Sequence, residues 1–264
     1  MTKISKKNIN EFKENGATLI PGLFTKWLPD IKKGIEYNLM HPGKYAAENT
    51  RENQSGRFFD DYCNWTRISE FEKIMSCPDV ISSAAKLMGS ASVQFFHDHV
   101  LYKSAGSETD TPWHQDEPYY FTKGNQNVSF WIPVDHIKES SLRIISGSHK
   151  WHKPVLPTKW LTGKDFYKSS NEYNPVPNPD INPDKYEILE WKMNPGDAIA
   201  FNFKSVHGAR ANKSDTQRRV LSLRYVGDDV RYIDRKEVTS PPFPGHNMNN
   251  GDKLRADWFP IFHP

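Results

Sequence analysis

Apolar residues recur at helical spacing through the first third of the chain. Residues 5–15, 25–40 and 69–88 each carry an apolar residue every three or four positions, which predicts three amphipathic helical segments. Pro78 breaks the third segment into two pieces. Gly89 is placed to end the second of these pieces, since glycine adopts the left-handed conformation that closes many helices.

After residue 90 the pattern changes to short runs of β-branched and aromatic residues. Segments rich in Gly, Asn, Asp and Ser separate these runs, and such segments favour turns. The runs, with one earlier example, are ATLIPGLF, SVQFFHDHVLYK, QNVSFWIPVDHI, LRIISGSHK, YEILEWKM, DAIAFNFKSVHG and RRVLSLRYVG. Several short strands at this spacing predict a β-sandwich or a β-barrel.

These patterns predict a single domain made of three parts. A helical N-terminal part covers about 1–90, a β-barrel covers about 91–230, and an irregular tail follows. A chain of 264 residues has a suitable length for one such domain, and its 13% aromatic residues supply a sizeable core. Within the barrel, the Pro- and Asn-rich segment 154–184 predicts a long loop, a feature that is usually functional or mobile.

Charge and cysteine content exclude several kinds of partner. The 35 Lys and Arg residues nearly balance the 32 Asp and Glu residues, for a net charge of +3, and this argues against a nucleic-acid or membrane partner. The chain has no apolar stretch of membrane-spanning length. Its two cysteines, Cys63 and Cys77, predict reduced thiols in a cytoplasmic protein. The sequence carries no signal of oligomeric state.

A possible metal site begins in the stretch TPWHQDEPYY. His114 and Asp116 stand two residues apart, so on an extended segment their side chains point to the same side. Alone, this pair fits a polar surface turn as well as a metal site. His207, at the end of a strongly apolar run, offers a third ligand. Two imidazoles and one carboxylate form the facial triad of non-haem Fe(II) oxygenases, which leaves coordination positions open for a co-substrate and dioxygen.

The run RRVLSLRYV brings two arginines to one face of a strand. By alternation, Arg218, Ser222 and Arg224 share a face. A guanidinium inside a barrel needs an anion, and a dicarboxylate co-substrate would satisfy Arg218. Arg224 suits an anionic substrate if it faces the cavity. The burial statistics of arginine instead favour an outward position, as a solvated or paired surface charge.

Five pieces of the chain, taken in order, resemble the phytanoyl-CoA dioxygenase family of Fe(II)/2-oxoglutarate oxygenases. They are WHQD, FWIPVDHI with LRIISGSHK, NPGDAIAFN, VHGARANKS and RRVLSLRY. The H-x-D pair alone is a weak signal, but the five pieces together are specific. The resemblance runs from KENGATLIPGLF to about RYVGDD, which is most of the chain.

The resemblance implies a fold, a metal and a co-substrate. The fold is mainly β with flanking helices, a double-stranded β-helix of the jelly-roll, cupin-like type. The implied Fe(II) ligands are His114, Asp116 and His207, and Arg218 is implied to bind the distal carboxylate of 2-oxoglutarate. Related halogenases lack the carboxylate ligand, so the presence of Asp116 disfavours halogenation.

The resemblance also implies further residues around the co-substrate. Trp131 matches a family tryptophan beside 2-oxoglutarate, and His99 falls near another position that approaches it. Ala209 departs from the family, in which a hydroxyl side chain often occupies this position. The positions expected to contact the substrate are Tyr102, Tyr119 and Arg224.

The function expected from the resemblance is hydroxylation of a small molecule. The enzyme would use O2 and release succinate and carbon dioxide. Two alternatives remain open from the sequence: a non-redox metal-binding cupin, such as an isomerase or a sensor, and a degenerate module that binds a ligand without catalysis.

Overall fold

The computed structural model describes residues 4–138, 142–168 and 171–264 of the chain. Its α-helices are α1 (Lys6–Asn15), α2 (Leu28–Met40), α3 (Ser69–Met75) and α4 (Pro78–Met88). Short 3-10 turns occur at η1 (Thr25–Trp27), η2 (Glu117–Tyr119), η3 (Ser148–Lys150) and η4 (Pro183–Lys185).

The helix boundaries follow from local chemistry. Ser5 caps α1 by accepting a hydrogen bond from the backbone N–H of Asn8, whose side chain bonds back to the Ser5 backbone. Pro78 begins α4, where its missing N–H costs nothing. Gly89 ends α4 with a φ of 64°, in the left-handed region. The three helical segments expected from the sequence are therefore confirmed, including the break at Pro78.

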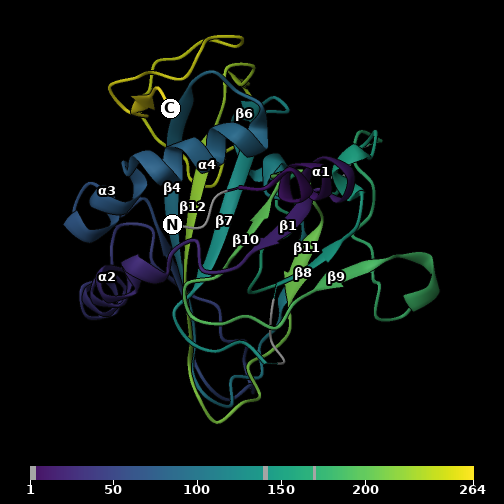
Figure 1. Cartoon of the computed structure of the whole chain (residues 1–264). Helices are drawn as coiled ribbons and strands as arrows, with labels where there is room; N and C mark the ends of the chain where they lie inside the picture. Colours follow the sequence, from purple (N-terminus) through teal and green to yellow (C-terminus); the bar gives the residue numbers. More distant parts are fainter. Residues whose placement is uncertain (1–3, 139–141, 169–170) are drawn as a thin grey trace.

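Two antiparallel sheets form the body of the protein (Figure 1). The larger sheet runs in the order β1 (Ala17–Ile20), β10 (Ala198–Phe201), β7 (Asn127–Pro133), β12 (Arg218–Val226), β4 (Val93–Lys103), β3 (Phe58–Tyr62) and β2 (Ala47–Glu48), and β14 (Ile261–Phe262) also pairs with β4. The smaller sheet runs in the order β5 (Thr111–His114), β11 (His207–Ala209), β8 (Leu142–Ile145) and β9 (Ile188–Glu190). A separate ribbon joins β6 (Thr122–Lys123) to β13 (Arg231–Tyr232).

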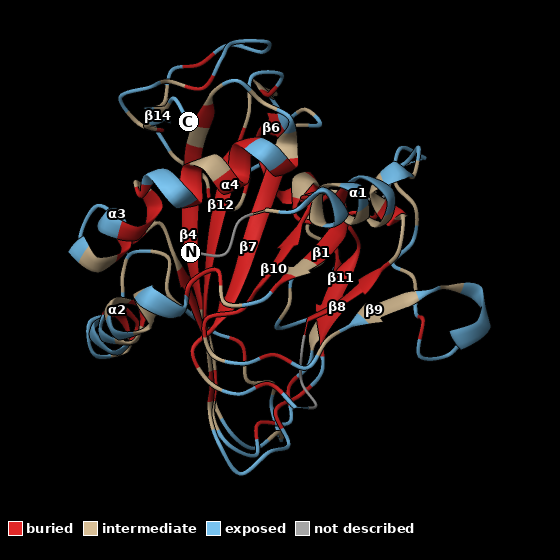
Figure 2. Cartoon of the chain, viewed as in Figure 1, coloured by how far each residue is buried: buried red, intermediate tan, exposed pale blue. Residues whose placement is uncertain are grey.

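The large sheet has two differently covered faces. On the outer face, α2 and α4 pack over its central strands, as Figure 1 shows. That packing buries alternate strand residues such as Val100, Phe130 and Leu223. On the inner face, Trp131 and Val220 meet Ile144 of the smaller sheet in a second apolar cluster. The central strands β7, β10 and β12 are almost wholly buried in Figure 2, which is the pattern of a jelly roll whose interior lies between two sheets.

The structure departs from the three expected parts in one respect. Besides β1, which the run ATLIPGLF predicted, the helical N-terminal segment supplies β2 and β3 to the large sheet, and the irregular tail supplies β14. These strands are two to five residues long, and such lengths carry little periodicity for sequence analysis to detect.

Two expectations about environment can be compared with the structure. Across the described residues, no helix has the length and apolar character needed to cross a membrane. Cys63 and Cys77 are free cysteines, as the sequence analysis expected.

Candidate metal centre and adjoining cavities

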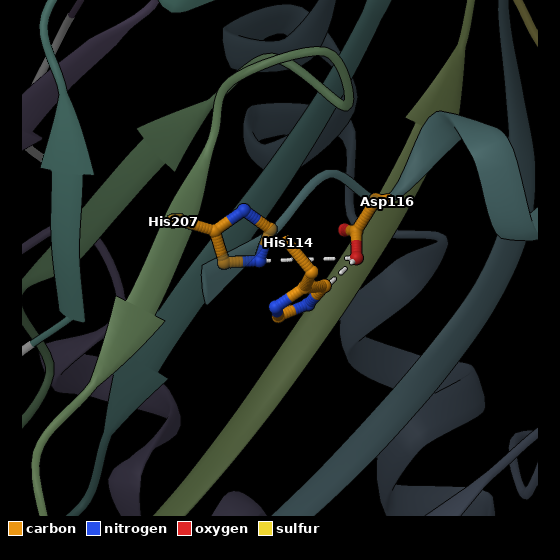
Figure 3. Close-up of side chains that lie close together, drawn as sticks. All are labelled: His114, Asp116 and His207. Atoms are coloured by element: carbon orange, nitrogen blue, oxygen red, sulfur yellow. Dashed lines mark ion pairs between the residues drawn. The ribbon is translucent and has the colours of Figure 1, made fainter. Parts of the chain in front are cut away.

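Three potential metal ligands meet between the two sheets (Figure 3). His114 ends β5, and His207 begins β11 directly opposite it in the antiparallel pair. Asp116 follows β5 by two residues, and its Oδ1 lies 3.7 Å from Nε2 of His114 and 3.8 Å from Nε2 of His207. All three side chains are buried. The register of one strand pair therefore joins residues that are about ninety positions apart in the chain.

Backbone carbonyls fix the orientation of both imidazoles. Nδ1 of His114 lies 2.8 Å from the carbonyl oxygen of Pro112, and Nδ1 of His207 lies 2.9 Å from that of Ser205. A carbonyl oxygen can only accept, so each Nδ1 carries the proton and each Nε2 keeps its lone pair. Metal-binding histidines are typically held in this way.

The donor set fits a single divalent ion. Ligand atoms about 2.1 Å from a common ion lie at most about 4.2 Å apart. The separations of Asp116 Oδ1 from the two imidazole nitrogens both fall within that limit. Two neutral imidazoles and one carboxylate suit a ferrous ion with open positions. The residues of this site therefore fit the metal that the sequence predicted.

Electrostatics keep these ligands ready for a metal. Burial alone would raise the pKa of Asp116, but the Arg224 guanidinium and the two imidazoles hold it well below its usual range. Burial, helped by the neighbouring His114, lowers the pKa of His207 to about 3. At neutral pH Asp116 is therefore ionised and His207 is neutral, the protonation states that bind metal.

A narrow cavity of about 30 Å³ adjoins the triad on the inner face of β12. Arg218 lines it, and the Arg218 side chain is buried. Burial lowers the pKa of this guanidinium to about 10, so it remains charged at neutral pH. Trp160, from the long loop, also lines this cavity and packs edge to face on His114. A five-carbon diacid fits here only if rim side chains such as Trp160 shift.

A second buried cation lies at the Arg218 end of this cavity. The ammonium of Lys103 donates to the carbonyl of Thr109 at 2.6 Å and lies 4.3 Å from the ring centre of Phe58. Burial, together with the charge of Arg218, holds the pKa of Lys103 well below its usual value. An anion bound between these two groups would relieve both effects.

A broader cavity of about 270 Å³ opens on the other side of the triad. It shares His99, His114, Trp160 and Arg224 with the narrow cavity, so the two adjoin at the metal site. Its remaining walls are largely aromatic and apolar, and include Tyr62, Tyr119, Tyr120, Leu161, Phe166 and Pro241. A small molecule bound here would lie beside the metal ligands, opposite the Arg218 end.

Three of the residues expected around the ligands do line these cavities. Trp131 faces the narrow cavity from β7. His99 lines both cavities, and its Nε2 lies 2.7 Å from the Asp60 carboxylate. Tyr119 lines the broad cavity, and its hydroxyl donates to the carbonyl of Thr158 at 2.7 Å. Their roles toward a ligand stay predictions.

The structure corrects two expectations. Tyr102 lies on the opposite face of β4 from His99, where it contacts the guanidinium of Arg57, and it lines neither cavity. Arg224 does not point outward as the burial statistics of arginine favoured. Its side chain is buried, lines both cavities, and donates from Nε to Oδ2 of Asp116 at 3.3 Å. The carboxylate that compensates its burial was not visible in the pattern of a single strand.

Sequence analysis did not single out Lys103 or Trp160 among the residues of these walls. Lys103 lies four residues after His99 on the same strand, so alternation would have placed it on the inner face. His97 precedes His99 by two residues and shares that face as well. Trp160 offered no such signal because it belongs to a loop, and a loop has no periodicity.

Comparisons with known proteins agree with this geometry. Residues 12–220 match the family described as Phytanoyl-CoA dioxygenase (PhyH). The peroxisomal phytanoyl-CoA dioxygenase of Rattus norvegicus is 23% identical over 201 residues, covering 74% of this chain and 54% of that protein. Dioxygenase lolE1 of Epichloe uncinata is 25% identical over 160 residues, covering 56% and 54%. The chain thus spans about half the length of the curated relatives that it matches.

Solved structures share the fold across nearly the whole chain. The epimerase SnoN, in complex with Fe3+, alpha ketoglutarate and nogalamycin RO, superposes with a TM-score of 0.74 at 16% identity, covering 97% of both chains. The carbocyclase SnoK gives 0.69 at 19% identity, covering 98% and 96%. EctD from S. alaskensis with 2-oxoglutarate and 5-hydroxyectoine gives 0.68 at 17% identity, covering 96% and 86%. These similarities establish the jelly-roll fold.

Proposed function

Because the chain belongs to the phytanoyl-CoA dioxygenase (PhyH) family, we propose that it is an Fe(II)- and 2-oxoglutarate-dependent dioxygenase. The proposed reaction hydroxylates an unactivated C–H bond of a small molecule and releases succinate and carbon dioxide. The observation that carries this proposal is the buried grouping of His114, Asp116 and His207 beside a cavity that contains the buried cation Arg218.

The residues of the chain divide the work of binding. His114, Asp116 and His207 would hold the ferrous ion, which supplies the redox chemistry with dioxygen when bound. Arg218 would bind the distal carboxylate of 2-oxoglutarate, with the Lys103 ammonium nearby. The side chains of Arg218 and Lys103 are buried, so their attraction for a bound carboxylate would be stronger than in water.

The co-substrate would occupy the narrow cavity and the primary substrate the broad one. Trp131 and His99 flank the first, and Tyr119 lines the second. Ala209 also lines the narrow cavity, so the hydroxyl that many relatives place there is absent from this wall.

Hydroxylation is the finer part of the proposal. The presence of the Asp116 carboxylate supports hydroxylation over halogenation. The structural neighbours include an epimerase and a carbocyclase, and hydroxylation, ring closure and epimerisation can share one iron site. The proposal includes a cytoplasmic location, which the two free cysteines support.

The test measures succinate formed from 2-oxoglutarate by the purified protein with Fe(II). We expect metal-dependent turnover in the wild-type protein, loss of it in His114→Ala, and retention in His152→Ala, which removes an exposed histidine away from both cavities. Retained turnover in His114→Ala would contradict the proposal. Stabilisation by metal with no succinate from the wild-type protein would favour the non-redox cupin instead.

A further inference from the structure

Two buried polar atoms in the broad cavity lack hydrogen-bond partners among the described residues. They are Nε2 of His97 and Nη1 of Arg224. His97 and Arg224 stand directly opposite each other in the β4–β12 pair, and both line the cavity. Their exposed fractions are 1% and 4%. A buried polar atom without a partner costs free energy, so a pair of them facing one cavity indicates a ligand.

The hydrogen-bonding character of His97 follows from its other nitrogen. Nδ1 lies 3.0 Å from the carbonyl oxygen of Asp98, which can only accept, so Nδ1 carries the proton. Burial, together with the Arg224 guanidinium, keeps the pKa of His97 well below its usual value, and the ring is neutral. The free Nε2 is therefore an acceptor that requires a donor.

Arg224 presents the opposite character at the same place. Its Nη1 is a donor that requires an acceptor. The charge of the guanidinium is already compensated, because Nε donates to Oδ2 of Asp116 at 3.3 Å and the Tyr120 hydroxyl also interacts with it. The cavity therefore offers one donor and one acceptor, without an uncompensated charge at this position.

We propose that His97 and Arg224 bind a hydroxyl group of the primary substrate, whose oxygen accepts from Arg224 and whose proton is donated to His97. The inference rests on the proposed function only in assigning the broad cavity to the primary substrate. A hydroxyl fits because a single oxygen both donates and accepts. A carboxylate would satisfy Arg224 but would place an anionic oxygen against the lone pair of His97.

This contact defines a substrate class and an orientation. The substrate is an alcohol whose remaining skeleton packs against aromatic walls such as Tyr119 and Phe166. Because Arg224 also contacts the metal ligand Asp116, the bound hydroxyl lies next to the metal site. The carbon that carries it, or a carbon close to it, is then presented for oxidation.

The experiment compares three probes of matched skeleton: 2-phenylethanol, ethylbenzene and phenylacetate. Equilibrium binding is measured on anaerobic protein loaded with Fe(II) and 2-oxoglutarate. We expect the alcohol to bind about tenfold more tightly than the hydrocarbon, the factor typical of a buried hydrogen-bond pair, and more tightly than the acid. His97→Phe keeps a ring but removes the acceptor, and should abolish the preference. His97→Gln restores an acceptor oxygen and should recover part of it.

The control is His246→Phe, which changes an imidazole packed against Phe121 and Tyr232 outside the lining of the broad cavity, and should preserve the preference. Equal binding of alcohol and hydrocarbon, no binding of any probe, or a preference that survives His97→Phe would each overturn the inference. Tighter binding of phenylacetate would overturn it in favour of an anionic substrate.

Failure of the proposed function gives a different result. The measurement is repeated on metal-free protein, because neither His97 nor Arg224 needs a metal to present its free atom. An alcohol preference without metal-dependent succinate formation contradicts the dioxygenase and retains the hydroxyl site. Succinate formation without an alcohol preference does the reverse.

Discussion

Strand β12 carries two arginines, Arg218 and Arg224, on the same face. Their surroundings differ. Arg218 lines the narrow cavity, where Lys103 is a second buried cation. Arg224, six residues on, donates to the carboxylate of Asp116, one of the three candidate metal ligands. The first end therefore holds two buried basic side chains in one cavity, and the second end holds one guanidinium that is paired with a carboxylate. The first suits a dicarboxylate and the second suits a neutral polar group.

The comparison shows that the face of a strand does not define the chemistry of a residue on it. Alternation places both arginines on the same face of the strand, because they are six residues apart. The difference comes from what the neighbouring elements present. The segment after β5 brings Asp116 to Arg224. Backbone carbonyls, the Lys103 side chain and the more distant carboxylate of Asp110 lie near the Arg218 end.

The largest effect is expected from removing the charge at the first end. Arg218→Met should weaken 2-oxoglutarate binding by a factor on the order of a hundred or more, because the substitution leaves a buried carboxylate without its partner. Metal binding should be nearly unchanged, since Arg218 donates to the carbonyl of Arg210, and the carboxylate that stabilises its charge is Asp110 rather than Asp116. Calorimetric titration with metal and then with 2-oxoglutarate separates the two quantities. An unchanged 2-oxoglutarate affinity would contradict the assignment of Arg218, rather than Arg224, to the co-substrate.

A smaller effect, on metal affinity, is expected from substituting Arg224. Arg224→Met removes the partner of Asp116 Oδ2, so metal affinity should fall about ten- to a hundredfold. Arg219→Met is the matched control. It lies on the same strand but on the outer face, where it pairs with Asp135. Metal titration of the three proteins checks this, and an equal loss in both variants would mean that a general loss of stability explains the result.

The smallest effect is a pH dependence of the free energy of unfolding that arises from His207, near Arg224. The pKa of His207 is about 3 in the folded protein, against about 6.5 for an ordinary histidine. Between these values the unfolded chain binds more protons, so the free energy of unfolding rises with pH. The metal-free protein should thus lose about 1.4 kcal/mol per pH unit from this group as pH falls from about 6 to 4.

This contribution can be isolated by difference. Urea unfolding of the metal-free wild-type protein and of His207→Gln, each at pH 6 and pH 4, gives two slopes. The slope of the variant should be shallower by that amount. Groups whose pKa does not depend on His207 cancel in the difference, including Asp98, whose buried carboxyl has a pKa raised to about 6 and so contributes with the opposite sign. Equal slopes would show that His207 is not held neutral by burial.

The sequence alone predicted the fold class and the three candidate metal ligands. Helical and strand periods gave the helices and the long strands, because a period needs only local residues to be visible. His114 and Asp116 were recognisable because a two-residue spacing on an extended segment places both side chains on one side. His207 and Arg218 followed from the order of motifs along the chain, which a resemblance over most of the chain preserves.

Only the tertiary structure decided which groups meet across the strands. The pairing of Arg224 with Asp116, and the register that sets it opposite His97, join residues more than one hundred positions apart. Local pattern fixes on which side of a strand a residue lies. Strand pairing brings in partners from distant parts of the chain. These partners decide the residue's charge, its protonation and which of its hydrogen-bonding atoms stay free.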